Sequence, residues 1–96
     1  MSPKFKLDNK VAVISGGTGI LGSTIALSFV KSKVKVVILG RNEKKIISTV
    51  EKLKKDGGDV IGFVCDVVSK KSLKNVSHEI LKKFRKIDIL LNAAGG

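Results

Sequence analysis

The 96-residue sequence has little of several residue types that define whole classes of protein. Its single cysteine, Cys65, excludes a disulfide within the chain and a zinc site built on paired cysteines. One proline beside ten glycines excludes collagen-like and low-complexity architectures. No run approaches the roughly 18 apolar residues of a membrane span, and the lysine-rich start lacks an apolar signal stretch. We therefore expect one soluble domain, residues 1–96, in the reducing cytoplasm and away from membranes.

Acidic residues are also scarce, with eight Asp and Glu against 19 Lys and Arg and a formal net charge of +11. Such an excess favours anionic partners, from mononucleotides to nucleic acid. The basic residues are nevertheless spread in ones and twos, and the chain has no Trp or Tyr on which bases could stack. The sequence thus favours a lysine-rich solvated surface. A basic, non-enzymatic module that binds nucleic acid stays as an alternative function.

The chain alternates between short apolar runs and segments with helical periodicity. Four apolar runs predict strands over 11–14, 34–39, 60–65 and 87–91. Continuous runs of this kind are typical of strands that are buried on both faces of a parallel sheet. Three amphipathic segments predict helices over 20–32, 42–55 and 69–85, with Asn42 and Ser69 as N-caps. This order predicts an α/β fold with a parallel sheet and right-handed crossovers.

A glycine-rich loop follows the first predicted strand directly. Gly17, Gly19 and Gly22 satisfy the spacing G-x-G-x-x-G between a strand and a helix. Glycines at this spacing permit a tight turn, close approach of a pyrophosphate and close packing of the helix on the sheet. The helix N-terminus adds free N–H groups and the positive end of its dipole. We therefore predict a dinucleotide site that includes Gly16, Gly17, Thr18, Gly19, Ile20, Leu21 and Gly22; the alternative is a glycine-rich structural turn.

The end of the second predicted strand bears on which dinucleotide is bound. A domain that binds NAD usually has Asp or Glu there, which holds the ribose 2′-hydroxyl. This sequence has Leu39-Gly40-Arg41-Asn42 instead, with no carboxylate. The guanidinium of Arg41 could pair with a 2′-phosphate. We therefore place Arg41 and Asn42 at the cofactor and predict NADP, with NAD possible; the alternative is a solvated Arg41.

Three ordered motifs resemble those of the short-chain dehydrogenase/reductase family. Residues 5–16 resemble the family's opening, although Ser15 stands where the family usually has Thr. Cys65-Asp66-Val67 resembles the pair after the third strand, whose acid meets the adenine ring. Residues 87–95 resemble the Asp-x-Leu-x-Asn-Asn-Ala-Gly element, with Ala93 in place of the second Asn. The resemblance adds to the predicted cofactor site Asp66, Val67, Asn92, Ala93, Ala94 and Gly95.

The resemblance implies a Rossmann-type sheet with strand order 3-2-1-4, two helices on one face and the third on the other. The glycine loop is similar to that of mannonate (fructuronate) oxidoreductase-like members. Family members carry a catalytic Ser and a Tyr-x-x-x-Lys further along chains of about 250 residues, whereas this sequence has no tyrosine.

The resemblance therefore implies a partial, truncated dinucleotide-binding domain of an oxidoreductase, without catalytic residues and inactive alone, that grips the adenosine-pyrophosphate part of its cofactor. An open fourth strand would invite self-association. A vestigial interaction subunit is a further alternative. No metal site is predicted, because His78 has no Cys or second His at helical spacing.

Overall fold

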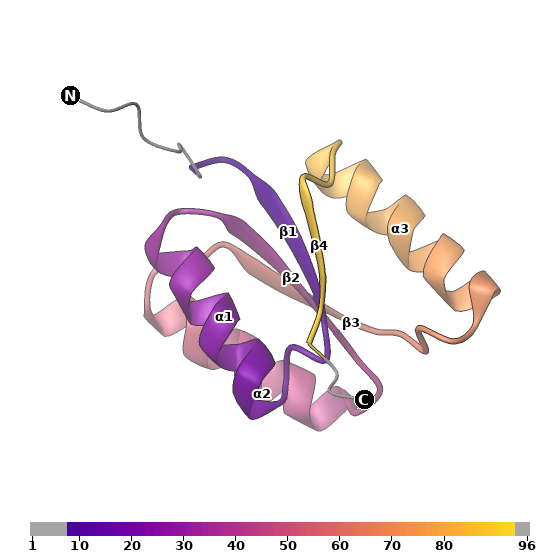
Figure 1. Cartoon of the computed structure of the whole chain (residues 1–96), viewed down its shortest axis with the longest axis horizontal. Coiled ribbons are helices and arrows are strands. Elements are labelled where there is room, and N and C mark those ends of the chain that lie inside the picture. Colours follow the sequence, from indigo (N-terminus) through magenta and orange to yellow (C-terminus); the bar gives the residue numbers. More distant parts are fainter. Residues whose placement is uncertain (1–7, 94–96) are drawn as a thin grey trace.

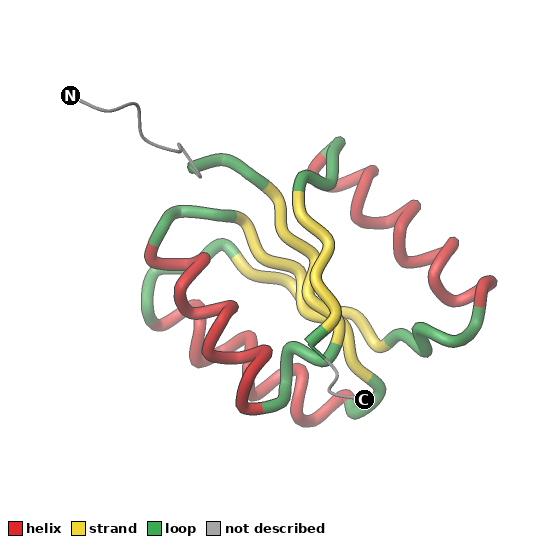
Figure 2. Tube along the Cα trace, viewed as in Figure 1, coloured by secondary structure: helices red, strands yellow, loops and turns green. Residues whose placement is uncertain are grey.

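A computed structural model describes residues 8–93. Four parallel strands form one sheet in the order β3-β2-β1-β4 (Figure 1). The strands are β1 (Val11–Ser15), β2 (Lys35–Gly40), β3 (Val60–Val64) and β4 (Ile89–Asn92). The connecting helices are α1 (Ile20–Lys31), α2 (Glu43–Lys55) and α3 (Lys70–Phe84), as Figure 2 shows. The predicted α/β class, the strand order and the three helices are confirmed, and only the ends of the elements differ slightly from the expectation.

The sheet buries its two faces against different helices. In Figure 1, α1 and α2 lie on one side of the sheet and α3 lies on the other. Ala12 and Ile14 of β1 belong to the core cluster on the side of α1 and α2. The alternate residues Val11 and Val13 pack with Ile80 of α3. A strand covered on both faces needs an apolar residue at every position, which explains the continuous apolar run.

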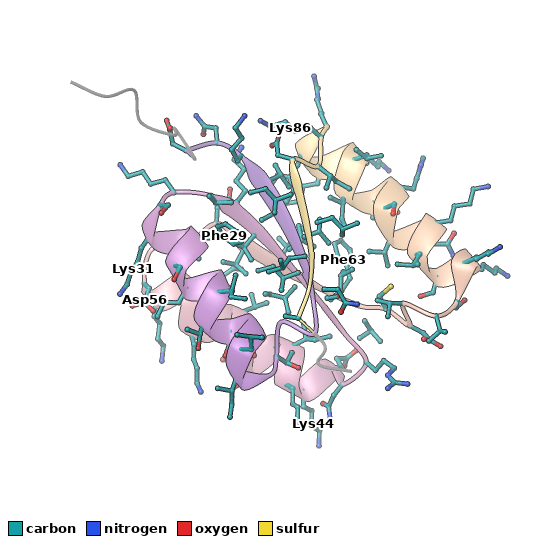
Figure 3. All side chains as sticks on the ribbon, in the orientation of Figure 1. Phe29, Lys31, Lys44, Asp56, Phe63 and Lys86 are labelled. Carbon is teal, nitrogen blue, oxygen red and sulfur yellow. The ribbon has the colours of Figure 1, made fainter. Side chains whose placement is uncertain are left out.

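Aromatic residues fill both layers while lysines lie at the periphery. Figure 3 shows Phe29 between α1 and the sheet, and Phe63 on the side that faces α3. Each packs against the core cluster of its own layer. Lys31 and Lys86 lie at the outside of the same view. The high lysine content is therefore compatible with two small apolar cores.

The prediction that every strand is buried on both faces is wrong at the outer strands. Leu90 of β4 is in register with Val13, yet Leu90 is 76% exposed and Val13 is 2% exposed. Val64, at the end of β3, is 52% exposed. Leu91 of β4 still packs against the core on the side of α1. The apolar side chain of Leu90 therefore lies on a part of the sheet face that the described helices leave open.

The helix ends confirm both predicted N-caps. The Asn42 side chain accepts a hydrogen bond from the Lys45 N–H (3.1 Å), and the Ser69 hydroxyl accepts one from the Ser72 N–H (3.2 Å). At the start of α1, by contrast, Gly19 supplies no side-chain cap. Among residues 8–93, no helix is long and apolar enough to cross a membrane.

Candidate dinucleotide-binding site

The carboxyl ends of β1, β2 and β3 meet around a hollow of about 200 Å³. The chain continues from β1 into α1 on one side of the sheet, and it returns to β4 after α3 on the other. The order of the strands thus reverses between β1 and β4, a switch point at which open α/β sheets bind ligands, and the hollow adjoins it at the end of β1. We call this hollow the switch-point hollow; its lining residues are Ser15, Gly16, Thr18, Leu39, Gly40, Arg41, Cys65, Asp66, Val67 and Val68.

Five of the predicted site residues line the switch-point hollow. The structure brings together Gly16, Thr18, Arg41, Asp66 and Val67. The sequence did not single out four other lining residues as ligand-binding: Leu39, Gly40, Cys65 and Val68. Their place along the chain could have identified them, because each lies at or just beyond the carboxyl end of β2 or β3.

The glycine loop is pinned to the sheet and to α1. Gly16 has a φ of 72°, a left-handed conformation that favours glycine. Its N–H donates to the Leu39 carbonyl (3.0 Å), and its carbonyl accepts from the Gly19 N–H (3.2 Å). A Cβ on Gly22 would overlap that carbonyl and lie 2.7 Å from the Gly17 Cα. The loop therefore needs glycine at Gly16 for its backbone and at Gly22 for the close approach of α1.

Gly19 differs from the other loop glycines because nothing within the described chain crowds it. A Cβ there would meet only the Gly16 carbonyl oxygen, at an ordinary 3.5 Å. Gly19 is exposed and precedes the first turn of α1, which has no side-chain cap and no acidic residue. The first N–H groups of a helix have no partner within the helix and attract anions. The missing side chain of Gly19 thus leaves these N–H groups open to an anionic ligand.

The end of β2 presents positive charge to the switch-point hollow. The Arg41 side chain is exposed and lines it. The side-chain oxygen of Asn42 accepts a hydrogen bond from the Lys45 N–H and so caps α2. A second hollow, of about 360 Å³, adjoins the first at Thr18 and has no carboxylate in its lining. We call it the lysine hollow; its lining residues are Thr18, Lys44, Lys45, Ser48, Thr49 and Lys52.

The segment after β3 is tied both to β2 and to α3. The Cys65 N–H donates to the Gly40 carbonyl (2.8 Å), and the Cys65 side chain is buried. The Asp66 N–H donates to the Ser72 hydroxyl (3.1 Å). The carboxylate oxygen Oδ1 of Asp66 accepts from the Val68 N–H (3.1 Å). The backbone of Asp66 is therefore fixed at the border of the hollow, and its carboxylate orders the residues that follow.

The polar residues at the end of β4 form a separate link to β1. The Ser15 hydroxyl donates to the Asn92 side-chain oxygen (3.1 Å), and the Ala93 N–H donates to the Ser15 carbonyl (2.8 Å). Ser15 thus joins β1 to β4 through both its hydroxyl and its carbonyl. Asn92 lines a hollow on the α3 side of the sheet rather than the switch-point hollow. The predicted site residues Ala94 and Gly95 lie outside the described residues.

Metal-ligating residues are not gathered in the part of the chain that the structure describes. There, no group of three or more His, Cys, Asp and Glu residues is placed to hold a metal ion. His78 is exposed on α3.

A parallel sheet in this order, with a glycine loop between β1 and α1, defines a Rossmann-type fold. The family model described as short chain dehydrogenase matches residues 10–96. The chain belongs to the short-chain dehydrogenase family.

Similar proteins are about three times as long as this chain. The uncharacterized oxidoreductase UxuB of Bacillus subtilis is 37% identical over 90 residues, which are 94% of this chain and 32% of the relative. Tropinone reductase-like 3 of Erythroxylum coca is 36% identical over 89 residues, which are 93% of this chain and 34% of the relative. The chain thus spans about a third of the length of these relatives.

Solved structures agree closely with the fold. An NAD+-bound xylitol dehydrogenase has a TM-score of 0.90 and 26% identity, covering 96% of this chain and 35% of its own. A protein described as a candidate D-mannonate oxidoreductase from Haemophilus influenza, with bound NAD, has a TM-score of 0.89 and 28% identity. That match covers 95% of this chain and 32% of the other. A mannonate oxidoreductase-like protein is thus among the similar structures, as the resemblance predicted.

Proposed function

We propose that this chain is the cofactor-binding part of a short-chain oxidoreductase and that it holds the adenosine diphosphate portion of a dinucleotide. The observation that carries this proposal is Gly19. Packing within the chain does not require glycine there, since a Cβ would make only an ordinary contact. A glycine that the fold does not need, at the uncapped start of α1, is accounted for by a pyrophosphate that approaches the helix.

We propose further that the chain prefers NADP over NAD. Arg41 lines the switch-point hollow and the lysine hollow adjoins it at Thr18, so a 2′-phosphate held between them would meet several cations, and the lining of the lysine hollow contains no carboxylate. Both solved structures described above contain NAD, which makes NAD the competing ligand for any test.

The residues described here would bind and orient the cofactor. When bound, a nicotinamide dinucleotide supplies or accepts a hydride. The N–H groups at the start of α1 would hold the pyrophosphate, and the residues after β2 and β3 would enclose the adenosine. We assign no catalytic residue to this chain, and its sequence contains no tyrosine.

Titration calorimetry with NADPH and NADH tests both proposals. We expect saturable NADPH binding with a dissociation constant in the submillimolar range. The dissociation constant for NADH should be larger. Gly19→Glu should abolish both, because the new carboxylate would occupy and repel the pyrophosphate position. Ser28→Glu, on an exposed position of α1, is the charge-matched control and should bind like the parent. A folded parent that binds neither nucleotide at millimolar concentration contradicts the proposed function.

The preference for NADP has its own pair of variants. Arg41→Ala should reduce NADPH binding about tenfold and leave NADH binding nearly unchanged, since one charge-assisted interaction is lost. Arg85→Ala, at the far end of α3, is the control. Equal losses of affinity for NADPH and NADH would show that Arg41 does not bind the 2′-phosphate.

We also propose that the outer edge of β4 can pair with a second copy of the chain. Within the described sheet, β4 has a strand on one side only, and Leu90 is 76% exposed. Sedimentation velocity at rising protein and salt concentration should reveal a dimer that Leu90→Lys removes. Leu81→Lys, at an exposed leucine of α3, should leave the dimer intact. A monomer under all these conditions contradicts this proposal.

A further inference from the structure

The hydroxyl of Ser72 holds the segment after β3 from the first turn of α3. It accepts a hydrogen bond from the Asp66 N–H (3.1 Å) and donates one to the Cys65 sulfur (3.5 Å). Its own backbone N–H donates to the hydroxyl of Ser69, the N-cap (3.2 Å). Ser72 thus connects the start of α3 to two residues that line the switch-point hollow.

These bonds leave the Ser72 hydroxyl a single orientation. Ser72 is the third residue of α3, a position from which a polar side chain commonly turns back to the N-cap N–H. Here the hydroxyl reaches further back, to the N–H of Asp66. Its one proton is donated to Cys65, so the lone pairs of the oxygen face Asp66. The backbone of Asp66 is therefore set by a helix that does not itself line the hollow.

We propose that Ser72 is a positioning residue that lets Asp66 distinguish adenine from hypoxanthine, an inference that rests on the proposed function. One carboxylate oxygen of Asp66, Oδ1, is held by the Val68 N–H. With the backbone fixed by Ser72, the other oxygen has a defined place at the border of the switch-point hollow. A carboxylate accepts a hydrogen bond from the exocyclic amine of adenine, and hypoxanthine has no such donor.

The distinguishing measurement is the ratio of the affinities for ADP and inosine diphosphate, which carry the same pyrophosphate. We expect the parent to prefer ADP by about tenfold, the factor typical of one charge-assisted hydrogen bond at a partly exposed site. Ser72→Ala should lower this ratio to about twofold while inosine diphosphate binding changes little. Ser72→Thr, which keeps the hydroxyl, should restore the preference. Ser77→Ala, on the same helix, is the control.

The outcomes separate this inference from the proposed function. If Ser72→Ala weakens both nucleotides equally, Ser72 supports the fold and the inference is overturned. The same follows if Ser72→Ala keeps the tenfold preference, or if the parent binds both nucleotides equally well, in which case the proposed function stands. A folded parent that binds neither nucleotide overturns both. The unfolding midpoint of each variant in urea shows that binding is compared between folded proteins.

Discussion

Replacing Gly22 with alanine tests how closely α1 packs against the glycine loop. The added Cβ would overlap the Gly16 carbonyl oxygen and lie 2.7 Å from the Gly17 Cα and 2.9 Å from the Gly16 carbonyl carbon. All three are backbone atoms, so no side-chain rotation can relieve the overlap. Either α1 moves away from the sheet or the loop changes its conformation.

Two opposing effects set the size of the change. Alanine within a helix is favoured over glycine by about 1 kcal/mol. Overpacking a close contact costs about 1–3 kcal/mol and occasionally more, and a contact with rigid backbone belongs at the upper end. We therefore expect Gly22→Ala to lower the free energy of unfolding by roughly 2 kcal/mol. In a domain of this size that corresponds to a fall in Tm of about 8–16 °C.

Thermal and urea unfolding followed by circular dichroism measures the effect, with Gly19→Ala as the matched control. A Cβ at Gly19 makes only the 3.5 Å contact with the Gly16 carbonyl oxygen. Gly19→Ala should therefore change stability by less than about 1 kcal/mol, mainly through the poorer N-cap. If Gly22→Ala is as stable as the parent, α1 does not approach the loop as described and the reasoning is refuted.

Four further substitutions, one of them a control, probe other parts of the fold through urea unfolding. Arg85→Gly should raise the free energy of unfolding by about 1 kcal/mol, because Arg85 ends α3 with a left-handed φ of 68°; a lower midpoint would contradict this. Leu53→Ala should lower the free energy of unfolding by about 2–5 kcal/mol, because Leu53 is only 4% exposed. Ile47→Ala on the same helix should lower it by less than about 1 kcal/mol, because Ile47 is 50% exposed. Equal losses at the two positions would show that α2 presents another face to the sheet. The Val11 N–H donates to the Asp88 carboxylate (2.8 Å) and lowers its pKa in the folded chain. The resulting stabilisation is present above the unfolded pKa of about 3.9 and lost as pH falls through the lower folded value. Asp88→Asn should therefore be less stable than the parent at pH 7 and approach it in acid, and a difference that does not depend on pH would disprove this role of Asp88.

The fold could be predicted from the sequence because the patterns that indicate it involve residues close together along the chain. The apolar run around Val13 and the spacing of the loop glycines depend on neighbouring residues, and both kinds of pattern persist in the structure. Asn42 and Ser69 were predicted as caps for the same reason, since an N-cap side chain bonds to an N–H of the next turn.

The features that the sequence did not predict depend on contacts between distant elements. The apolar pattern of β4 is that of a buried strand, but α3 does not cover Leu90. The sequence predicted only a lysine-rich solvated surface, and the placement of α2 beside Thr18 brings Lys44 and Lys45 into the lining of a hollow. The bond between Ser72 and Asp66 joins residues only six positions apart, but it depends on how α3 is oriented after β3, which no spacing along the chain specifies.

The most direct test of the account is a titration of the isotope-labelled chain with NADPH, followed through its backbone amide resonances by NMR. We predict that the largest shifts fall on residues 16–22, 39–41 and 65–68, which form the glycine loop and the carboxyl ends of β2 and β3. The lysines at the far end of α3, Lys82 and Lys83, should shift little. Shifts spread over the lysines of α3, or none at millimolar NADPH, would contradict a dinucleotide site at the switch point.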